Sequence, residues 1–187
     1  MLIFTMNSIS EGTFKAKSKK LKILIGKVSN ERGEDFNNSV YYKIKELDIQ
    51  VFKKIKKINN KKIADISGNT LGDLDILYII PKKKLIVVGE VKDFNFSKSP
   101  YEMDQEYKKM FLDTEKEKCF ATKHKRRVDW VLNHIDDLKV EYGLKDYKWR
   151  VKSLFIVNEP IISNAFYDKG LKIITYSQLN RKILENI

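Results

Sequence analysis

The chain has few of the residues that build several common kinds of functional site. Its 187 residues include one cysteine, Cys119, and two histidines, His124 and His134. A single cysteine excludes an intrachain disulfide and any cysteine-based zinc cluster. A helix would place the two histidines roughly 80° apart in phase, so they predict no histidine metal site.

Long apolar runs, glycine-rich phosphate loops, internal repeats and Pro- or Ser-rich linkers are also missing. No apolar stretch reaches the roughly 18 residues of a membrane-spanning helix. The opening Met1–Phe4 is too short for a signal segment. We therefore expect a soluble, cytoplasmic protein without a membrane partner, and no serine or cysteine has a convincing base for nucleophilic catalysis. The length suits one domain with its own core.

Positive charge is the most marked feature of the composition. The formal net charge is +12 at pH 7, and the isoelectric point is about 9.5. Such a balance favours a polyanionic partner, with nucleic acid ahead of an anionic membrane. The alternative is that the lysines only keep a Lys-, Asn- and Ile-rich chain in solution.

Residues 72–93 contain two apolar, β-branched runs around a short Pro/Lys break, which is the pattern of a β-hairpin. If Pro81–Lys84 form a four-residue loop, Asp75 falls opposite Glu90 and Asp73 falls opposite Lys92. Opposed residues share a face of the sheet, with Cβ atoms roughly 5 Å apart. One face would then carry three carboxylates and one ammonium group.

Like charges facing each other destabilise a sheet unless they are compensated. A divalent cation would compensate them, since carboxylate oxygens are ligands that Mg²⁺ prefers. The alternative is an exposed edge hairpin whose charges are solvated. Both strands are too apolar on both faces to favour that alternative.

The segments Gly72–Leu77 and Gly89–Lys92 resemble the core of the PD-(D/E)xK nuclease superfamily, which has the restriction-endonuclease-like fold. In that family an Asp on one strand and a Glu-x-Lys on the next form the metal site, and the matching positions here are Asp75, Glu90 and Lys92. Leu74 stands where the nominal motif has proline. The order of elements agrees over roughly residues 31–180, but only these two strands are specific.

The resemblance implies a metal-dependent nuclease, with a DNA endonuclease favoured and DNA favoured over RNA as partner. Asp75, Glu90 and the Val91 carbonyl would hold Mg²⁺ or Mn²⁺, and Lys92 would orient the attacking water. The runner-up is a nucleic-acid-binding module of the same fold that does not cut. The charge disfavours a third class, the protein–protein interaction domain. A homodimer and a larger parent protein both stay open.

A helix is predicted from an N-cap at Ser29 or Asn30 to about Leu47. It contains Arg-Gly-Glu34, which resembles the first-helix signature of several branches of the superfamily, where the Glu points into the site. Other branches place the acid three residues later, where this chain has Asn37. Glu34 as a catalytic and metal-ligating residue, and Glu34 as a plain acid of the first helical turn, both stay open.

The remaining pattern predicts an α/β fold with a restriction-endonuclease-like core, in which a mixed central β-sheet is flanked by helices. Residues 1–30 are predicted to be an extension of uncertain structure, and residues 31–187 the nuclease-like domain. The other expected elements are a strand over 49–58, helices over 101–113 and 115–141, strands over 151–157 and 171–176, and a short last helix capped by Ser177.

The start of the predicted helix over 115–141 is rich in cations. Lys123, Arg126 and Arg127 are the candidates for binding nucleic-acid phosphate next to the Glu-x-Lys strand. A cation-rich helix of this kind also resembles a nuclear-localisation run, which is only a compositional signal.

Overall fold

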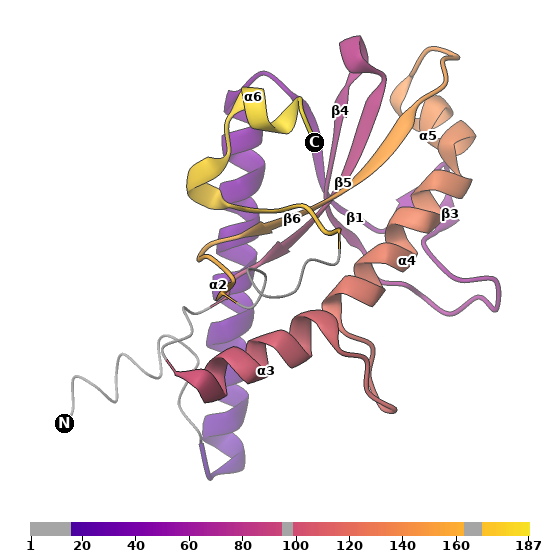
Figure 1. Ribbon diagram of the computed structural model, residues 1–187. Helices are drawn as coiled ribbons and strands as arrows, with labels where there is room; N and C mark the ends of the chain where they lie inside the picture. Colours follow the sequence, from indigo (N-terminus) through magenta and orange to yellow (C-terminus); the bar gives the residue numbers. More distant parts are fainter. Residues whose placement is uncertain (1–15, 95–98, 163–169) are drawn as a thin grey trace.

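A five-stranded mixed sheet forms the centre of the computed structural model, which describes residues 16–94, 99–162 and 170–187 (Figure 1). The strand order is β1-β4-β5-β6-β7, and β1, β4 and β5 are antiparallel while β5, β6 and β7 are parallel. The strands are β1 (Gln50–Ile55), β4 (Leu74–Ile80), β5 (Leu85–Lys92), β6 (Arg150–Val157) and β7 (Ile173–Thr175). The predicted α/β class with a mixed sheet flanked by helices is confirmed, and the restriction-endonuclease-like fold stays a prediction.

The β4–β5 hairpin has the predicted register. Ile80 pairs with Leu85 and Ile76 pairs with Gly89 across a four-residue connection. The connection is a 3₁₀ turn, η1 (Pro81–Lys83), followed by Lys84 in the left-handed region with φ 51°. Proline fixes the φ angle that the first position of this turn needs, which explains why the Pro/Lys break located the turn correctly.

Helix α2 (Lys19–Glu46) ends where predicted but begins eleven residues earlier than the predicted N-cap. The cap is Ser18, whose Oγ accepts a hydrogen bond from the Leu21 N–H at 3.3 Å. Residue 30, the predicted boundary of the extension, lies inside this helix, so the boundary does not coincide with the start of an element. Residues 1–15 of that extension lie outside the described part of the chain.

The predicted helix over 115–141 is two helices, α4 (Phe120–Asn133) and α5 (Ile135–Tyr142). Cys119 caps the start of helix α4, and the helical conformation is interrupted at His134, where φ is −120°. Helix α3 (Pro100–Phe111) agrees with its prediction. The last helix, α6 (Arg181–Leu184), is capped by Asn180 rather than by Ser177, which belongs to the preceding 3₁₀ turn, η3 (Tyr176–Gln178).

The strand predicted over 49–58 is divided. Its first part is β1, and its end forms β2 (Lys57–Ile58), which pairs with β3 (Lys61–Lys62) in a separate two-stranded sheet. The turn between them contains Asn59 and Asn60, both with positive φ, as the Asn-Asn sequence favours.

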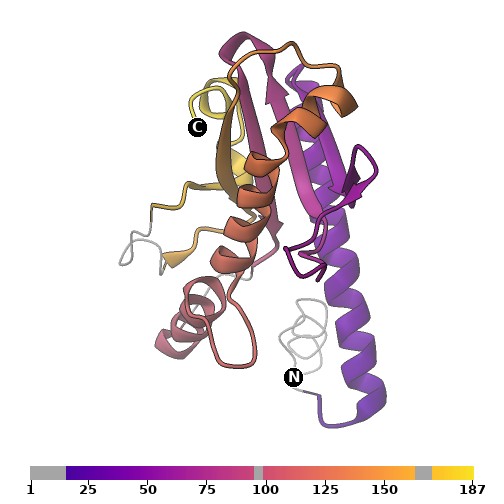
Figure 2. The same cartoon turned by 90° about the vertical axis from the view of Figure 1, so that its right-hand side faces the viewer.

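Helices cover both faces of the central sheet (Figure 2). On one face Val40 and Ile44 of α2 pack on Ile76 and Tyr78 of β4. On the other face α4 and α5 cover Leu77 and Ile79 of β4 and the side chains of β5 that point to the same side, such as Val88. The N-terminal half of α2 extends past the sheet, and its only buried residue is Ile25. None of the helices in the described ranges combines the length and the apolar character needed to cross a membrane.

We expect Ile44→Ala to destabilise the protein by about 2–5 kcal/mol, because Ile44 is completely buried between α2 and the sheet. Ile23→Ala on the same helix removes a side chain that is 65% exposed and should change stability by less than about 0.5 kcal/mol. Urea unfolding of both variants measures the difference. Equal losses would contradict this account of how α2 packs.

Candidate active site

The site lies where the pairing of β4 with β5 ends. The last paired residues are Ile76 and Gly89, and one step further the Asp75 carboxylate accepts a hydrogen bond from the Val91 N–H at 2.9 Å. The Asp75 side-chain oxygen takes the place of the main-chain oxygen that would accept this N–H if the pairing of β4 with β5 continued. Asp73 precedes the first residue of β4, so its predicted pairing with Lys92 does not form.

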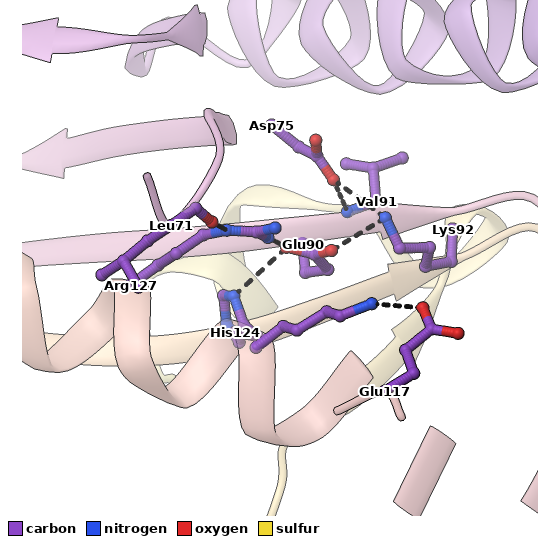
Figure 3. A network of polar contacts seen from close by, with 9 residues as sticks. Leu71, Asp75, Glu90, Val91, Lys92, Glu117, His124 and Arg127 are labelled. Carbon is purple, nitrogen blue, oxygen red and sulfur yellow. Dashed lines mark hydrogen bonds and ion pairs between the residues drawn. The ribbon is translucent and has the colours of Figure 1, made fainter. Parts of the chain in front are cut away.

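Lys92 brings the two predicted carboxylates together (Figure 3). Its ammonium group is 2.8 Å from Glu90 Oε1 and 3.5 Å from Asp75 Oδ2. Burial lowers the pKa of Lys92, but the negative charges of Glu90 and Asp75 raise it further, and the net pKa is above its ordinary value. Lys92 is therefore held as an ammonium group that can donate hydrogen bonds.

Glu90 is 2% exposed and is compensated from helix α4. Arg127 Nη1 donates a hydrogen bond to Glu90 Oε2, and Arg127 Nε donates to the Leu71 carbonyl at 2.8 Å. Burial raises the pKa of Glu90, but the neighbouring His124, Lys92 and Arg127 together bring this pKa well below its ordinary value. Glu90 is therefore a buried anion that neighbouring cations stabilise.

The opposite holds for Asp75. Burial, followed by the negative charge of Glu90, raises the pKa of Asp75 above its ordinary value, and Lys92, the Val91 N–H and Arg127 compensate only in part. The two carboxylates of one sheet face are thus shifted in opposite directions. Additional positive charge would therefore stabilise the ionised form of Asp75 more than that of Glu90.

The loop before β4 depends on a glycine because of Arg127. Gly72 has φ +86°, and a Cβ placed on it would lie 3.2 Å from Arg127 Nη2. Both the backbone conformation and the space favour glycine at this position. The residue at position 72 therefore has to leave room for the guanidinium group that holds Glu90.

His124 is a site residue that the sequence reasoning did not include. It is 1% exposed, its Nδ1 is 3.5 Å from Glu90 Oε2, and its ring meets Phe155 edge-on at 4.7 Å between centroids. Neither ring nitrogen has a hydrogen-bond partner among the described residues, so the 3.5 Å approach is a close contact and not a hydrogen bond. The signal that could have found it is its spacing of three residues from Arg127, which puts both on one helix face.

Glu34 lies elsewhere. Its side chain is 55% exposed and pairs with Lys54 of β1, and it forms no hydrogen bond or ion pair with Asp75, Glu90 or Lys92 within the described residues. Asn37, one turn later, is buried instead, and its Oδ1 has no hydrogen-bond partner in the described part of the chain. The structure therefore does not bring Glu34 into the cluster, because the helix turns it outward.

The three cations predicted to bind nucleic acid all have partners on the protein. Lys123 is 2.6 Å from Glu117, Arg126 is 3.1 Å from Asp65, and Arg127 points inward to Glu90. Lys123 and Arg126 keep 34% and 47% of their side chains exposed and could still reach a ligand. Arg127 could contact a phosphate only by releasing Glu90, and its surroundings fit a structural counter-ion better.

We expect Arg127→Met to cost about 3–5 kcal/mol of stability, because it leaves the buried Glu90 without one of its two cations. Arg126→Met, the adjacent matched change, breaks an exposed pair with Asp65 and should cost less than about 1 kcal/mol. Urea unfolding distinguishes the two. Adding Glu90→Gln to Arg127→Met should recover part of the loss, and a purely additive double variant would contradict the pairing.

We also expect Asp75→Asn to raise the melting temperature at pH 7. Since the pKa of Asp75 is raised in the folded protein, its ionised form destabilises the fold above that pKa, and the penalty is absent below the ordinary value of 3.8. The gain should therefore shrink as the pH falls towards 3.8. Asp136→Asn, at an exposed carboxylate of α5, should change little at either pH. A lower melting temperature for Asp75→Asn at pH 7 would contradict this view.

Comparisons of the chain with protein-family models, with curated proteins and with solved structures find no match. The resemblance of its two central strands to the PD-(D/E)xK superfamily stays a prediction.

Proposed function

We propose that the protein is a metal-dependent hydrolase of nucleic-acid phosphodiester bonds, with DNA as the favoured substrate. The observation that supports this proposal most directly is the meeting of Asp75, Glu90 and Lys92 at the end of the β4–β5 hairpin. Two carboxylates and an ammonium group on one sheet face suit phosphodiester hydrolysis better than a structural role, because their burial costs stability.

The donor set fits Mg²⁺ or Mn²⁺ in chemical terms. No group of three or more His, Cys, Asp or Glu side chains among the described residues is arranged to hold a metal ion. Mg²⁺, however, usually uses one or two carboxylates together with waters and substrate phosphate. Asp75 and Glu90, with the Val91 carbonyl, would hold it here. When bound, such an ion supplies polarisation of the phosphodiester and a more acidic water.

The protein groups have separate roles in this proposal. Lys92 is an ammonium group, so it would orient the attacking water and donate to the phosphate oxygens on which charge develops. Arg127 does not touch the reacting atoms but fixes the orientation of Glu90 and anchors the loop before β4 at Leu71. His124 lies 3.5 Å from the same carboxylate and is itself buried.

A second candidate function is nucleic-acid binding without cleavage. The observation that favours it is the compensation of Glu90 by protein cations alone, with Lys92 at Oε1 and Arg127 at Oε2. A carboxylate already satisfied in this way has less to gain from a metal ion. The net charge of +12 supports both functions equally.

Cleavage of plasmid, single-stranded DNA and RNA with Mg²⁺, Mn²⁺ or EDTA separates the two functions. We expect wild-type cleavage that EDTA abolishes, and Asp75→Asn should reduce it on the order of 10³-fold or more, because groups that act as a unit fail together. This variant is well suited to the test because we expect it to be at least as stable as the wild type at pH 7.

Asp136→Asn makes the same chemical change at an exposed position and should cleave as the wild type does. Cleavage that persists in Asp75→Asn would overturn the assigned site. If the wild type cleaves no substrate with either metal but binds DNA in EDTA, the binding function takes the place of the hydrolase.

A further inference from the structure

A groove of about 590 Å³ runs along the outer edge of the central sheet, where β1 is the last strand. Its walls come from both sides of the sheet, with Tyr41 of α2 at one side and Tyr142 at the end of α5 at the other. Figures 1 and 2 show these two helices on opposite faces of the sheet. The groove therefore wraps around an edge strand that no other strand of the described chain covers.

The lining of this β1 groove is strongly basic. It contains four lysines, Lys53, Lys54, Lys56 and Lys57, and a single acid, Glu141. Lys53 and Lys54 are engaged with Asn38 and Glu34 of α2. The exposed side chains of Lys56 and Lys57 form no ion pair within the described residues. Two ammonium groups are thus free for an anionic ligand.

Lysines on an edge strand can also serve only to prevent pairing with another sheet. That role requires no hollow surface and no aromatic lining. The β1 groove has both, since Tyr41, Phe52 and Tyr142 contribute to its walls and the rings of Phe52 and Tyr142 lie 4.2 Å apart. A basic groove lined by aromatic rings is the usual combination for binding a single strand of nucleic acid, in which lysines follow the phosphates and rings contact the bases.

The register places this groove beside the candidate active site. Lys53 pairs with Ile76 and Ile55 pairs with Leu74, so Lys54 lies level with Asp75 on the neighbouring strand. Adjacent strands are about 4.8 Å apart. Lys56 and Lys57 follow directly after the end of β1, and Lys57 begins β2. A strand of nucleic acid that runs from these two lysines onto β1 would therefore pass close to Asp75.

We infer that the β1 groove is a binding subsite for single-stranded nucleic acid, with the phosphates at Lys56 and Lys57 and the strand leading to Asp75. This inference deepens the proposed function, on which its connection to Asp75 rests. Binding in the groove itself requires no cleavage and no metal ion, so it can be measured separately.

The test measures binding of fluorescein-labelled oligo(dT), and of a duplex of equal length, by anisotropy in EDTA at several salt concentrations. For Lys56→Ala/Lys57→Ala we expect affinity for oligo(dT) to fall on the order of tenfold or more at 50 mM salt. The slope of log affinity against log salt should become less steep by about 1.4, since each lost single-strand phosphate contact contributes about 0.7.

Lys82→Ala/Lys182→Ala is the matched control, because it removes the same charge at exposed lysines of the hairpin turn and of α6, near the other end of β4. It should leave most of the affinity and the slope unchanged. Equal effects of the two double variants would overturn the assignment of the β1 groove as a binding subsite. Wild-type affinity of Lys56→Ala/Lys57→Ala for oligo(dT) would overturn it as well. Melting curves of both variants verify that they fold.

The comparison of oligo(dT) with duplex and with polyglutamate tests the class of ligand. A loss of affinity for duplex equal to that for oligo(dT) would overturn the single-strand assignment, and competition by polyglutamate as strong as by oligo(dT) would overturn nucleic acid as the occupant. If cleavage fails on every substrate while oligo(dT) binding depends on Lys56 and Lys57, the proposed hydrolase is wrong and the groove is upheld. If the protein cleaves DNA but its binding of oligo(dT) does not depend on Lys56 and Lys57, the groove assignment is wrong and the proposed hydrolase is supported.

Discussion

The burial of the Glu90 carboxylate is the constraint on which the site depends. A carboxylate with 2% exposure in a sheet face is very unfavourable unless cations and hydrogen bonds compensate it. Lys92 from the same strand supplies one cation, and Arg127 from α4 supplies the other. The position of α4 on the sheet and the charge state of Glu90 are therefore two aspects of one interaction.

This interaction also fixes the loop that leads into β4. The Nε–H of Arg127 donates a hydrogen bond to the Leu71 carbonyl, which brings the guanidinium group against Gly72. The strand that carries Asp75 begins only two residues later. The geometry of Asp75 relative to Glu90 thus depends on three segments at once, namely the hairpin, the preceding loop and helix α4. A cluster held in this way is preorganised, as a hydrolytic site requires.

The parts of this arrangement that could be predicted are local in sequence. The hairpin register follows from the turn at Pro81 and the alternation of side chains, so the placement of Asp75, Glu90 and Lys92 on one face of the sheet was accessible from the sequence alone. The contact of Arg127 with Glu90 spans 37 residues and depends on how α4 packs, which no local pattern specifies. The pairing of Glu34 with Lys54 depends in the same way on packing between α2 and β1.

Errors in the helix boundaries have a related origin. Ser29 and Asn30 are good caps in isolation, yet they lie inside α2, because Ser18 caps the helix earlier. His134 divides the predicted helix over 115–141 into α4 and α5, and the ring of His134 stacks on Trp130 at 4.0 Å between centroids. Such choices between competing local signals are decided by the whole chain.

The opposite pKa shifts of Asp75 and Glu90 restrict how a polyanion can approach this face. Glu90 is compensated by the protein, whereas burial and, after it, the negative charge of Glu90 both disfavour the ionised form of Asp75. A phosphate at about 4 Å from a carboxylate adds a repulsion of about 4 kcal/mol at an effective dielectric constant near 20. If a phosphodiester reaches Asp75, a cation must arrive with it, because Lys92 is already shared between two carboxylates. Under the proposed function, a nucleic acid would bind beside β1 without metal, because lysines outnumber acids there, and would enter the carboxylate cluster only together with a cation.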